Sequence, residues 1–163
     1  MGKRGYIFTI DAFIAMLITT IGVVLVYLAY TSSPDIYQQR AISQDVMIVF
    51  STTELSSLNS EYVDEQVASG NITNMKNTIF EQISEFYVKD MIGEAQNMTK
   101  NLSGSLIPAQ YSYEIWLDGK LMHNKSYVTN DIRQLSVSKI ILIGNLDPAT
   151  IWGPYEGEVI VWQ

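Results

Sequence analysis

The feature that most constrains this chain is an apolar run near its start, from Tyr6 to Tyr30, in which Asp11 is the only charged side chain. A helix rises about 1.5 Å per residue, so these 25 residues form a rod of about 37 Å. That is longer than the roughly 30 Å of a bilayer's hydrocarbon core. A helix that is apolar all round must be covered by lipid or by other apolar surfaces.

Three interpretations account for this segment and for the Lys3-Arg4 pair before it. A cleaved secretory signal fits the basic start, but the apolar run is about twice the usual length and no A-x-A cleavage site follows it. A plain transmembrane anchor would keep Lys3 and Arg4 in the cytoplasm and place the C-terminal part outside. A third interpretation keeps that orientation and gives the helix a second role in an assembly.

The third interpretation begins with Lys3-Arg4-Gly5, the phrase RGYIFTIDAF and the long apolar helix with an early acid. Together they resemble the class III signal of archaeal type IV pilin-like proteins. The resemblance implies that a prepilin peptidase cuts after Gly5, so that residues 1–5 are a leader and Tyr6 is the new N-terminus. It also implies that residues 6–30 are retained and become the packed core of a filament. Bacterial pilins carry Glu where this chain has Ile10, and here the acid comes one position later.

Asp11 has two interpretations. It lies about 7–8 Å into the helix, so its carboxylate can extend to the headgroups and avoid part of the roughly 2.5–3.5 kcal/mol cost of an acid at mid-bilayer. Alternatively, as the resemblance implies, it pairs with the new α-ammonium group of Tyr6 in a neighbouring subunit and fixes the axial register. The residues alone leave both interpretations open.

A seam of small residues runs along the apolar segment: Ala12, Ala15, Thr19, Gly22 and Ala29. Their spacings of three, four, three and seven residues place them on one face of a helix. Small residues let helix backbones approach one another closely. The seam therefore favours helix–helix assembly over a solitary anchor.

The residues after the apolar run, 31–163, predict an extracytoplasmic head that begins with helices over about 34–102. Ser33 and Pro34 predict the start of a helix that runs to about Ser51. A short helix follows near Glu61–Ala68, with Gly70 as its stop.

A better marked helix starts at Thr78, or slightly earlier near Thr73 or Asn74, because Thr78 and Glu81 have the spacing of a capping box. Apolar residues recur along it every three or four positions: Phe80, Ile83, Tyr87, Met91, Ala95 and Met98. Such a stripe needs an apolar partner, most simply a sheet. We therefore expect Met91 and Met98 to pack in a core and not to hold a cofactor.

From Tyr111 to Leu117 the period changes to two, and Asp118-Gly119 predicts a hairpin turn into a strand over Lys120–Val128. Ser136–Ile143 and Glu156–Trp162 predict two more strands of an antiparallel sheet over about 110–163. Loop signals separate these two strands, at Asn145–Pro148 and Trp152–Pro154. The expected fold class is α+β: a long N-terminal hydrophobic helix followed by further helices packed on a small antiparallel β-sheet, which is also the plan of the pilin family.

Catalytic and nucleic-acid-binding patterns are largely missing. The net charge is −7 and no basic cluster follows Lys3-Arg4, which argues against a nucleic-acid partner. One histidine, His123, and no cysteine cannot form the usual zinc ligand set. Four acids share the polar side of the capped helix: Glu81, Glu85, Asp90 and Glu94. We expect this side to face solvent, although the residues alone leave open a catalytic carboxylate pair of the kind found in hydrolases. We expect no catalytic residue, no metal and no cofactor, and therefore no enzyme.

Four N-x-S/T sequons suggest a glycosylated protein, although ordinary surface triplets explain them equally well: Asn71, Asn97, Asn101 and Asn124. Glycans on Asn97 and Asn101, four apart, would keep one helix face in solvent. Three aromatic residues near the C-terminus either stack on sugars or belong to the core and an interface: Trp152, Tyr155 and Trp162.

The expected function is that of a structural subunit of an extracellular archaeal type IV pilus-like filament, for adhesion or surface attachment. Its expected partners are copies of itself through residues 6–30, the membrane before assembly, a prepilin peptidase with the pilus assembly machinery, and N-glycans. The N-terminus would be cytoplasmic and the C-terminus outside. The alternative is a single-pass anchored module that binds a carbohydrate or an envelope protein, or a minor pilin. A membrane-tethered enzyme comes third and would need a concave pocket with several acids or His123.

Overall fold

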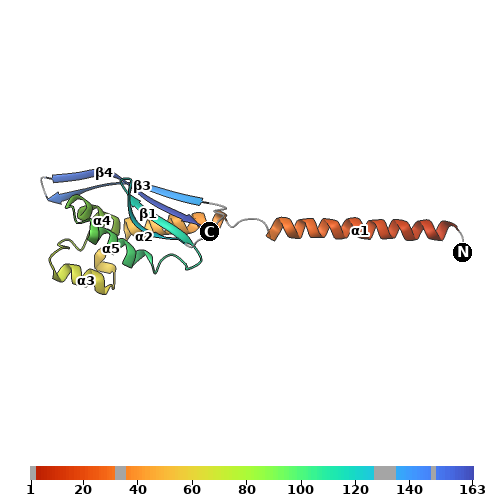
Figure 1. Ribbon diagram of the computed structural model, residues 1–163, viewed down its shortest axis with the longest axis horizontal. Coiled ribbons are helices and arrows are strands. Elements are labelled where there is room, and N and C mark those ends of the chain that lie inside the picture. Colours follow the sequence, from red (N-terminus) through yellow and green to blue (C-terminus); the bar gives the residue numbers. More distant parts are fainter. Residues whose placement is uncertain (1–2, 32–35, 127–134, 148–149) are drawn as a thin grey trace. The chain divides into compact units, whose positions relative to one another are not determined.

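The computed structural model describes residues 3–31, 36–126, 135–147 and 150–163. The chain divides into two units, Met1–Asp35 and Ile36–Gln163, and each is treated by itself. The first unit contains the unbroken helix α1 (Lys3–Thr31). The second unit, the head, contains α2 (Ile36–Thr52), the short 3₁₀ helix η1 (Leu55–Ser57), α3 (Glu61–Ala68), α4 (Ile79–Val88), α5 (Ile92–Ser103), β1 (Ser112–Leu117), β2 (Lys120–Lys125), β3 (Leu135–Asp147) and β4 (Thr150–Trp162) (Figure 1).

The described strands form one antiparallel sheet in the order β2-β1-β4-β3. Helix α2 packs against β3 and β4, and α5 packs against β2. The helices of the head lie on one side of the sheet (Figure 1). The expected α+β fold is therefore confirmed, with an N-terminal apolar helix followed by helices on an antiparallel sheet.

The core of the head lies between this sheet and the helices. The period-two pattern is confirmed, because Tyr113, Ile115 and Leu117 of β1 are all buried. Beneath the sheet, the rings of Phe50 in α2 and Phe80 in α4 meet edge to face, with centroids 5.2 Å apart. Burial of such alternating and aromatic side chains holds the layers together.

Local signals at three element boundaries are also confirmed. The backbone N–H of Thr78 donates to Glu81 Oε2 at 2.7 Å, and the N–H of Glu81 donates to Thr78 Oγ1 at 3.3 Å, which completes the capping box of α4. Asp118 and Gly119 have φ of 50° and 73°, as a two-residue hairpin turn requires. Gly70, with φ of 78°, follows the end of α3.

The prediction of one continuous helix from Thr78 to Met98 is wrong. Helix α4 ends at Val88 and α5 begins at Ile92. Between them Asp90 adopts a left-handed conformation, with φ of 59°, and the N–H of Met91 donates to the carbonyl of Phe86 at 2.8 Å. Asp tolerates this conformation better than most residues, so the turn closes the C-terminus of α4. The apolar stripe runs through the break because α4 and α5 contribute to the same core.

The loop predicted at Trp152–Pro154 is also wrong, because these residues belong to β4, and Asn145–Asp147 belong to β3. Leu142 pairs with Tyr155 and Gly144 with Trp152, so β4 carries one extra residue here. A bulge of this kind accommodates Gly and Pro within a strand. Strand β2 begins at Lys120, as predicted, and runs to Lys125. Three predictions lie outside the described residues: the Ser33-Pro34 helix start, the strand end at Val128 and the turn residue Pro148.

Candidate functional site

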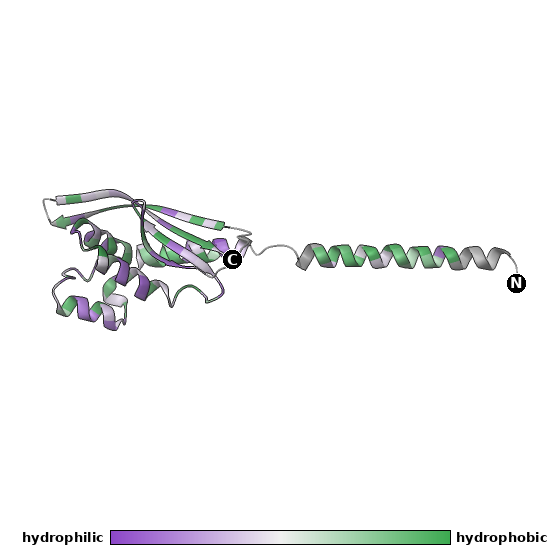
Figure 2. Cartoon of the chain, in the orientation of Figure 1, coloured by the Kyte–Doolittle hydropathy of each residue, from purple (hydrophilic) through white to green (hydrophobic). Residues whose placement is uncertain are grey.

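The apolar surface of α1 is the candidate site of function. From Ile10 to Leu28 it offers 19 residues with a mean hydropathy of 2.2, and none of this stretch is buried within its own unit. Figure 2 shows that apolar residues surround the helix and are not confined to one stripe. This length and composition suit a helix that crosses a membrane, and an N-terminal signal sequence has the same properties.

The two threonine hydroxyls of this stretch are satisfied within the helix. Thr19 Oγ1 donates to the carbonyl of Ala15, and Thr20 Oγ1 donates to that of Met16, each at 2.8 Å. Threonine often bonds back to the carbonyl four residues earlier in this way. These hydroxyls therefore need no water and can lie in an apolar environment.

The small-residue seam lies on one face because α1 is an unbroken helix. Its described members, Ala12, Ala15, Thr19 and Gly22, are all exposed. No heavy atom lies within 4 Å of a Cβ built at Gly22. Asp11 is also exposed and shares this face, because it precedes Ala15 by four residues and Gly22 by eleven. Helical spacing is the signal in the sequence that joins the acid to the seam.

The backbones of Gly5, Tyr6 and Ala29 belong to α1, but their side chains lie outside the described residues. The cleavage after Gly5 and the pairing of Asp11 with the N-terminus of Tyr6 therefore stay predictions.

Three of the four sequon asparagines lie close together on the head. Asn97 and Asn101 are exposed on α5, and Asn101 Nδ2 donates to the carbonyl of Asn97 at 2.9 Å. Asn97 and the exposed Asn124 of β2 line the same shallow groove between α5 and β2. Asn71 is separate and half-buried, and its Nδ2 donates to Gln66 Oε1 at 2.8 Å. The structure thus adds Asn124 to the surface that Asn97 and Asn101 were predicted to share.

His123 lies in the same groove and is half-buried in β2. Its ring contacts that of Tyr113 edge to face, with centroids 5.7 Å apart. Burial, followed by the positive charges of Lys100 and Lys125, lowers the pKa of His123 below its ordinary value. The imidazole is therefore neutral near pH 7. A catalytic histidine is usually oriented by an acid, whereas the charged neighbours that act on His123 are the lysines Lys100 and Lys125.

The acids of the capped helix do not all form the solvated face that we predicted. Glu85 is buried and accepts from Lys89 Nζ and from Asn77 Nδ2, the latter at 2.7 Å. Glu94 is half-buried and accepts from the hydroxyl of Tyr62 at 2.9 Å. Burial, and then this carboxylate, raises the pKa of Tyr62 above its ordinary value. The pair Glu85–Lys89 has a spacing visible in the sequence, but the contacts with Asn77 and Tyr62 depend on the fold.

Among the residues that the structure describes, no group of three His, Cys, Asp or Glu side chains could hold a metal ion.

The aromatic residues near the C-terminus belong mainly to the core. Trp152 and Trp162 are buried, so for these two the core interpretation holds over sugar stacking. The half-buried Tyr155 stacks on Trp152 with ring centroids 5.9 Å apart.

Comparison of the chain with protein-family models, with curated proteins and with solved structures found no match. The resemblance to pilin-like proteins therefore depends on the residues at the start of the chain, together with the order of an apolar helix, further helices and an antiparallel sheet.

Proposed function

We propose that this chain is the structural subunit of an extracellular archaeal type IV pilus-like filament that serves adhesion or surface attachment. The observation that carries the proposal is the stretch Ile10–Leu28, which is long, apolar and not buried within its own unit. Such a surface must be covered, and the seam of Ala12, Ala15, Thr19 and Gly22 suits close packing against other helices.

The proposed mechanism has two stages. The helix first holds the subunit in the membrane, with Lys3 and Arg4 on the cytoplasmic side and the head outside. A prepilin peptidase then cuts after Gly5, and the assembly machinery moves the helix from lipid into a bundle of its own copies. This transfer costs little because neighbouring apolar helices are about as apolar as lipid. The contact between copies must be heterologous, so that it extends as a helical array and does not close into a ring.

Asp11 would then set the register between neighbouring helices. Its carboxylate lies on the face of the seam and would meet the α-ammonium group of Tyr6 in an adjacent subunit. Inside an apolar bundle an unpaired carboxylate is unfavourable, so only the axial position that pairs the two charges is well tolerated.

The second candidate function is that of a single-pass anchored module that binds a carbohydrate or an envelope protein. The polar groove between α5 and β2 favours it, since Asn97, Lys100 and His123 offer hydrogen-bonding groups there. In this case α1 would remain in lipid.

Two measurements on native material test the proposal. Mass analysis of the N-terminus should show a mature start at Tyr6, and electron microscopy after removal of detergent should show filaments. An intact Met1, or a start beyond Tyr30, would oppose processing by a prepilin peptidase. Solitary particles that always need detergent on α1 would favour the anchored module.

A further inference from the structure

Strand β3 has an open edge and an apolar outer face. Among the described strands it pairs with β4 alone and ends the sheet. Four of its side chains alternate on the face turned away from the helices, with exposed fractions of 56, 43, 63 and 60%: Leu135, Val137, Ile141 and Ile143. Exposure of such an apolar row to water is unfavourable, so this face of β3 is a candidate interface.

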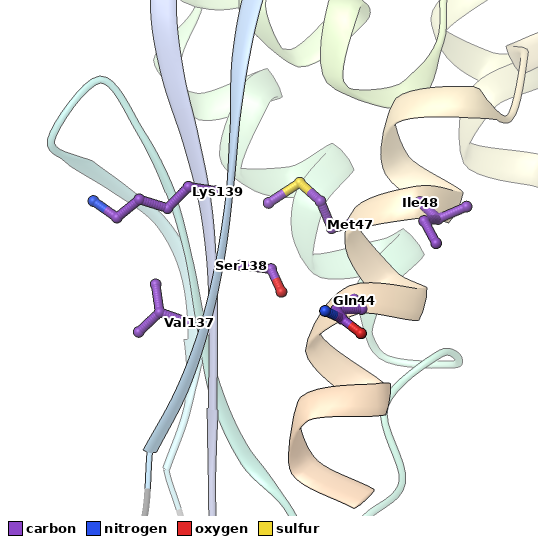
Figure 3. Close-up of a pocket in the computed structure, with 6 residues that line it drawn as sticks. All are labelled: Gln44, Met47, Ile48, Val137, Ser138 and Lys139. Carbon is purple, nitrogen blue, oxygen red and sulfur yellow. The ribbon is translucent and has the colours of Figure 1, made fainter. Parts of the chain in front are cut away.

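The inner face of the same strand is occupied by α2. Ser43 of α2 lies 3.0 Å, hydroxyl to hydroxyl, from both Ser136 and Ser138. Next to this contact a groove of about 430 Å³ runs between α2 and β3, with Met47 among its lining residues. Figure 3 shows Ser138 turned towards α2, while Val137 and Lys139 point to the other side of the strand. The backbone of β3 is therefore reachable along this groove.

The charge in the middle of β3 does not protect its open edge. Exposed edge strands usually carry a charge, a proline or a bulge that prevents pairing with another chain. Lys139 Nζ bonds Glu156 Oε1 at 2.9 Å and Glu158 Oε1 at 2.8 Å. Both acids belong to β4, so the ammonium group is held on the paired side of the strand. The open side presents backbone groups flanked by apolar side chains.

We propose that β3 pairs edge to edge with β3 of a second copy of this chain. Only an extended strand can satisfy the alternating N–H and C=O groups of an open edge, which excludes a helix as the occupant. This contact is a second self-association surface, and it does not depend on the role proposed for α1.

The side chains of β3 select one antiparallel register. The row Leu135, Val137, Lys139, Ile141 and Ile143 has the same pattern in both directions about Lys139. With Lys139 opposite its own copy, Val137 meets Ile141 and Leu135 meets Ile143, so every apolar residue of the row has an apolar partner. Like charges directly opposite each other are unfavourable, but each Lys139 ammonium group is already paired with Glu156 and Glu158 of its own sheet. A shift of two residues removes two of the four apolar pairs and sets both Lys139 side chains opposite apolar residues, so apolar pairing favours the symmetric register.

The area of the contact indicates a weak, symmetric pair. A strand of 13 residues is about 43 Å long, and a sheet is about 10 Å thick, so the edge covers roughly 430 Å² per copy. A standard interface buries about 800 Å² per partner. Pairing therefore needs copies held close together, as on a membrane or a filament. An isologous contact is complete with two copies, so it joins heads without extending an array.

Disulfide cross-linking of the full chain, reconstituted at high density in lipid vesicles, tests the proposal, because the protein contains no cysteine of its own. In the symmetric register Lys139→Cys faces itself, within the span of less than about 7 Å between Cα atoms that a disulfide needs. The matched control, Val137→Cys, lies about 13 Å from its own copy and cannot link to it. We expect at least about tenfold more linked dimer from Lys139→Cys under mild oxidation. A mixture of Val137→Cys and Ile141→Cys should give linked heterodimer.

Equal linking by Lys139→Cys and Val137→Cys, or none by either, would overturn the pairing. Both substitutions are on an exposed surface, so neither threatens the core. The result is independent of the filament proposal. Filaments without this cross-link would refute only the pairing of β3, and the cross-link without filaments would refute only the role of α1.

Discussion

Replacing Gly22 with Leu tests whether α1 packs against other helices. No heavy atom lies within 4 Å of a Cβ at this position, so the new side chain meets no obstacle in the subunit itself. Gly is about 0.8–1.0 kcal/mol less favourable than Ala inside a helix, and Leu ranks close to Ala, so the change favours the helix. Leu also inserts into lipid with a gain of about 0.3–0.6 kcal/mol. The separate, membrane-held subunit should therefore be at least as stable as the native chain.

In a packed bundle the same change has the opposite sign. Gly22 lies on the seam where helix backbones approach closely, and extra methylenes at a close contact cost about 1–3 kcal/mol. Since about 1.4 kcal/mol corresponds to a factor of ten, the concentration needed for assembly should rise about 5- to 150-fold. This rise should be seen only in assembly, because only there does Gly22 contact another helix.

The assay removes detergent at a series of protein concentrations, pellets the filaments and examines them by electron microscopy. Val24→Leu is the matched control, because Val24 is exposed, lies about 200° around the helix from Gly22 and gains a single methylene. Its concentration for assembly should match that of the native chain. If Gly22→Leu and Val24→Leu assemble equally well, the seam does not face another helix and the reasoning is refuted.

Three further predictions concern the head. Thr78→Ala removes the side-chain oxygen that caps α4 and should lower the free energy of unfolding by about 1 kcal/mol in urea titrations; an unchanged midpoint would contradict the role of the cap. Gly144→Ala places a Cβ 2.3 Å from Cζ2 of Trp152 and should cost about 1–3 kcal/mol with a change in near-ultraviolet circular dichroism, whereas Gly93→Ala, with nothing within 4 Å, should cost nothing. Equal stability of these two variants would show that the indole does not pack on Gly144. Because the pKa of Tyr62 is raised in the folded state, its contribution is present below about pH 10 and is lost as the pH rises further. Tyr62→Phe should therefore flatten the alkaline loss of stability, and an unchanged slope between about pH 9 and 11 would argue against a buried, hydrogen-bonded phenol.

Local patterns in the sequence were sufficient for those elements whose signals lie within a few adjacent residues. The apolar run predicts α1, the alternation from Tyr111 to Leu117 predicts β1, and Asp118-Gly119 predicts the hairpin, because each depends on the geometry of a few adjacent residues. The capping box of Thr78 and Glu81 is local for the same reason. The seam and Asp11 were equally visible, since a helix has one period along its whole length.

Tertiary structure decided what the same signals could not. Trp152–Pro154 reads as a loop but lies in β4, because Gly144 on the neighbouring strand leaves room for the indole of Trp152. Glu85 reads as a surface acid but is buried, because Asn77 and Lys89 both donate to it. The open edge of β3 follows from the order of the described strands, in which β3 is the last. Each of these depends on residues that are distant in the chain or in other strands, and local periodicity carries no information about which surfaces long-range packing leaves covered or exposed.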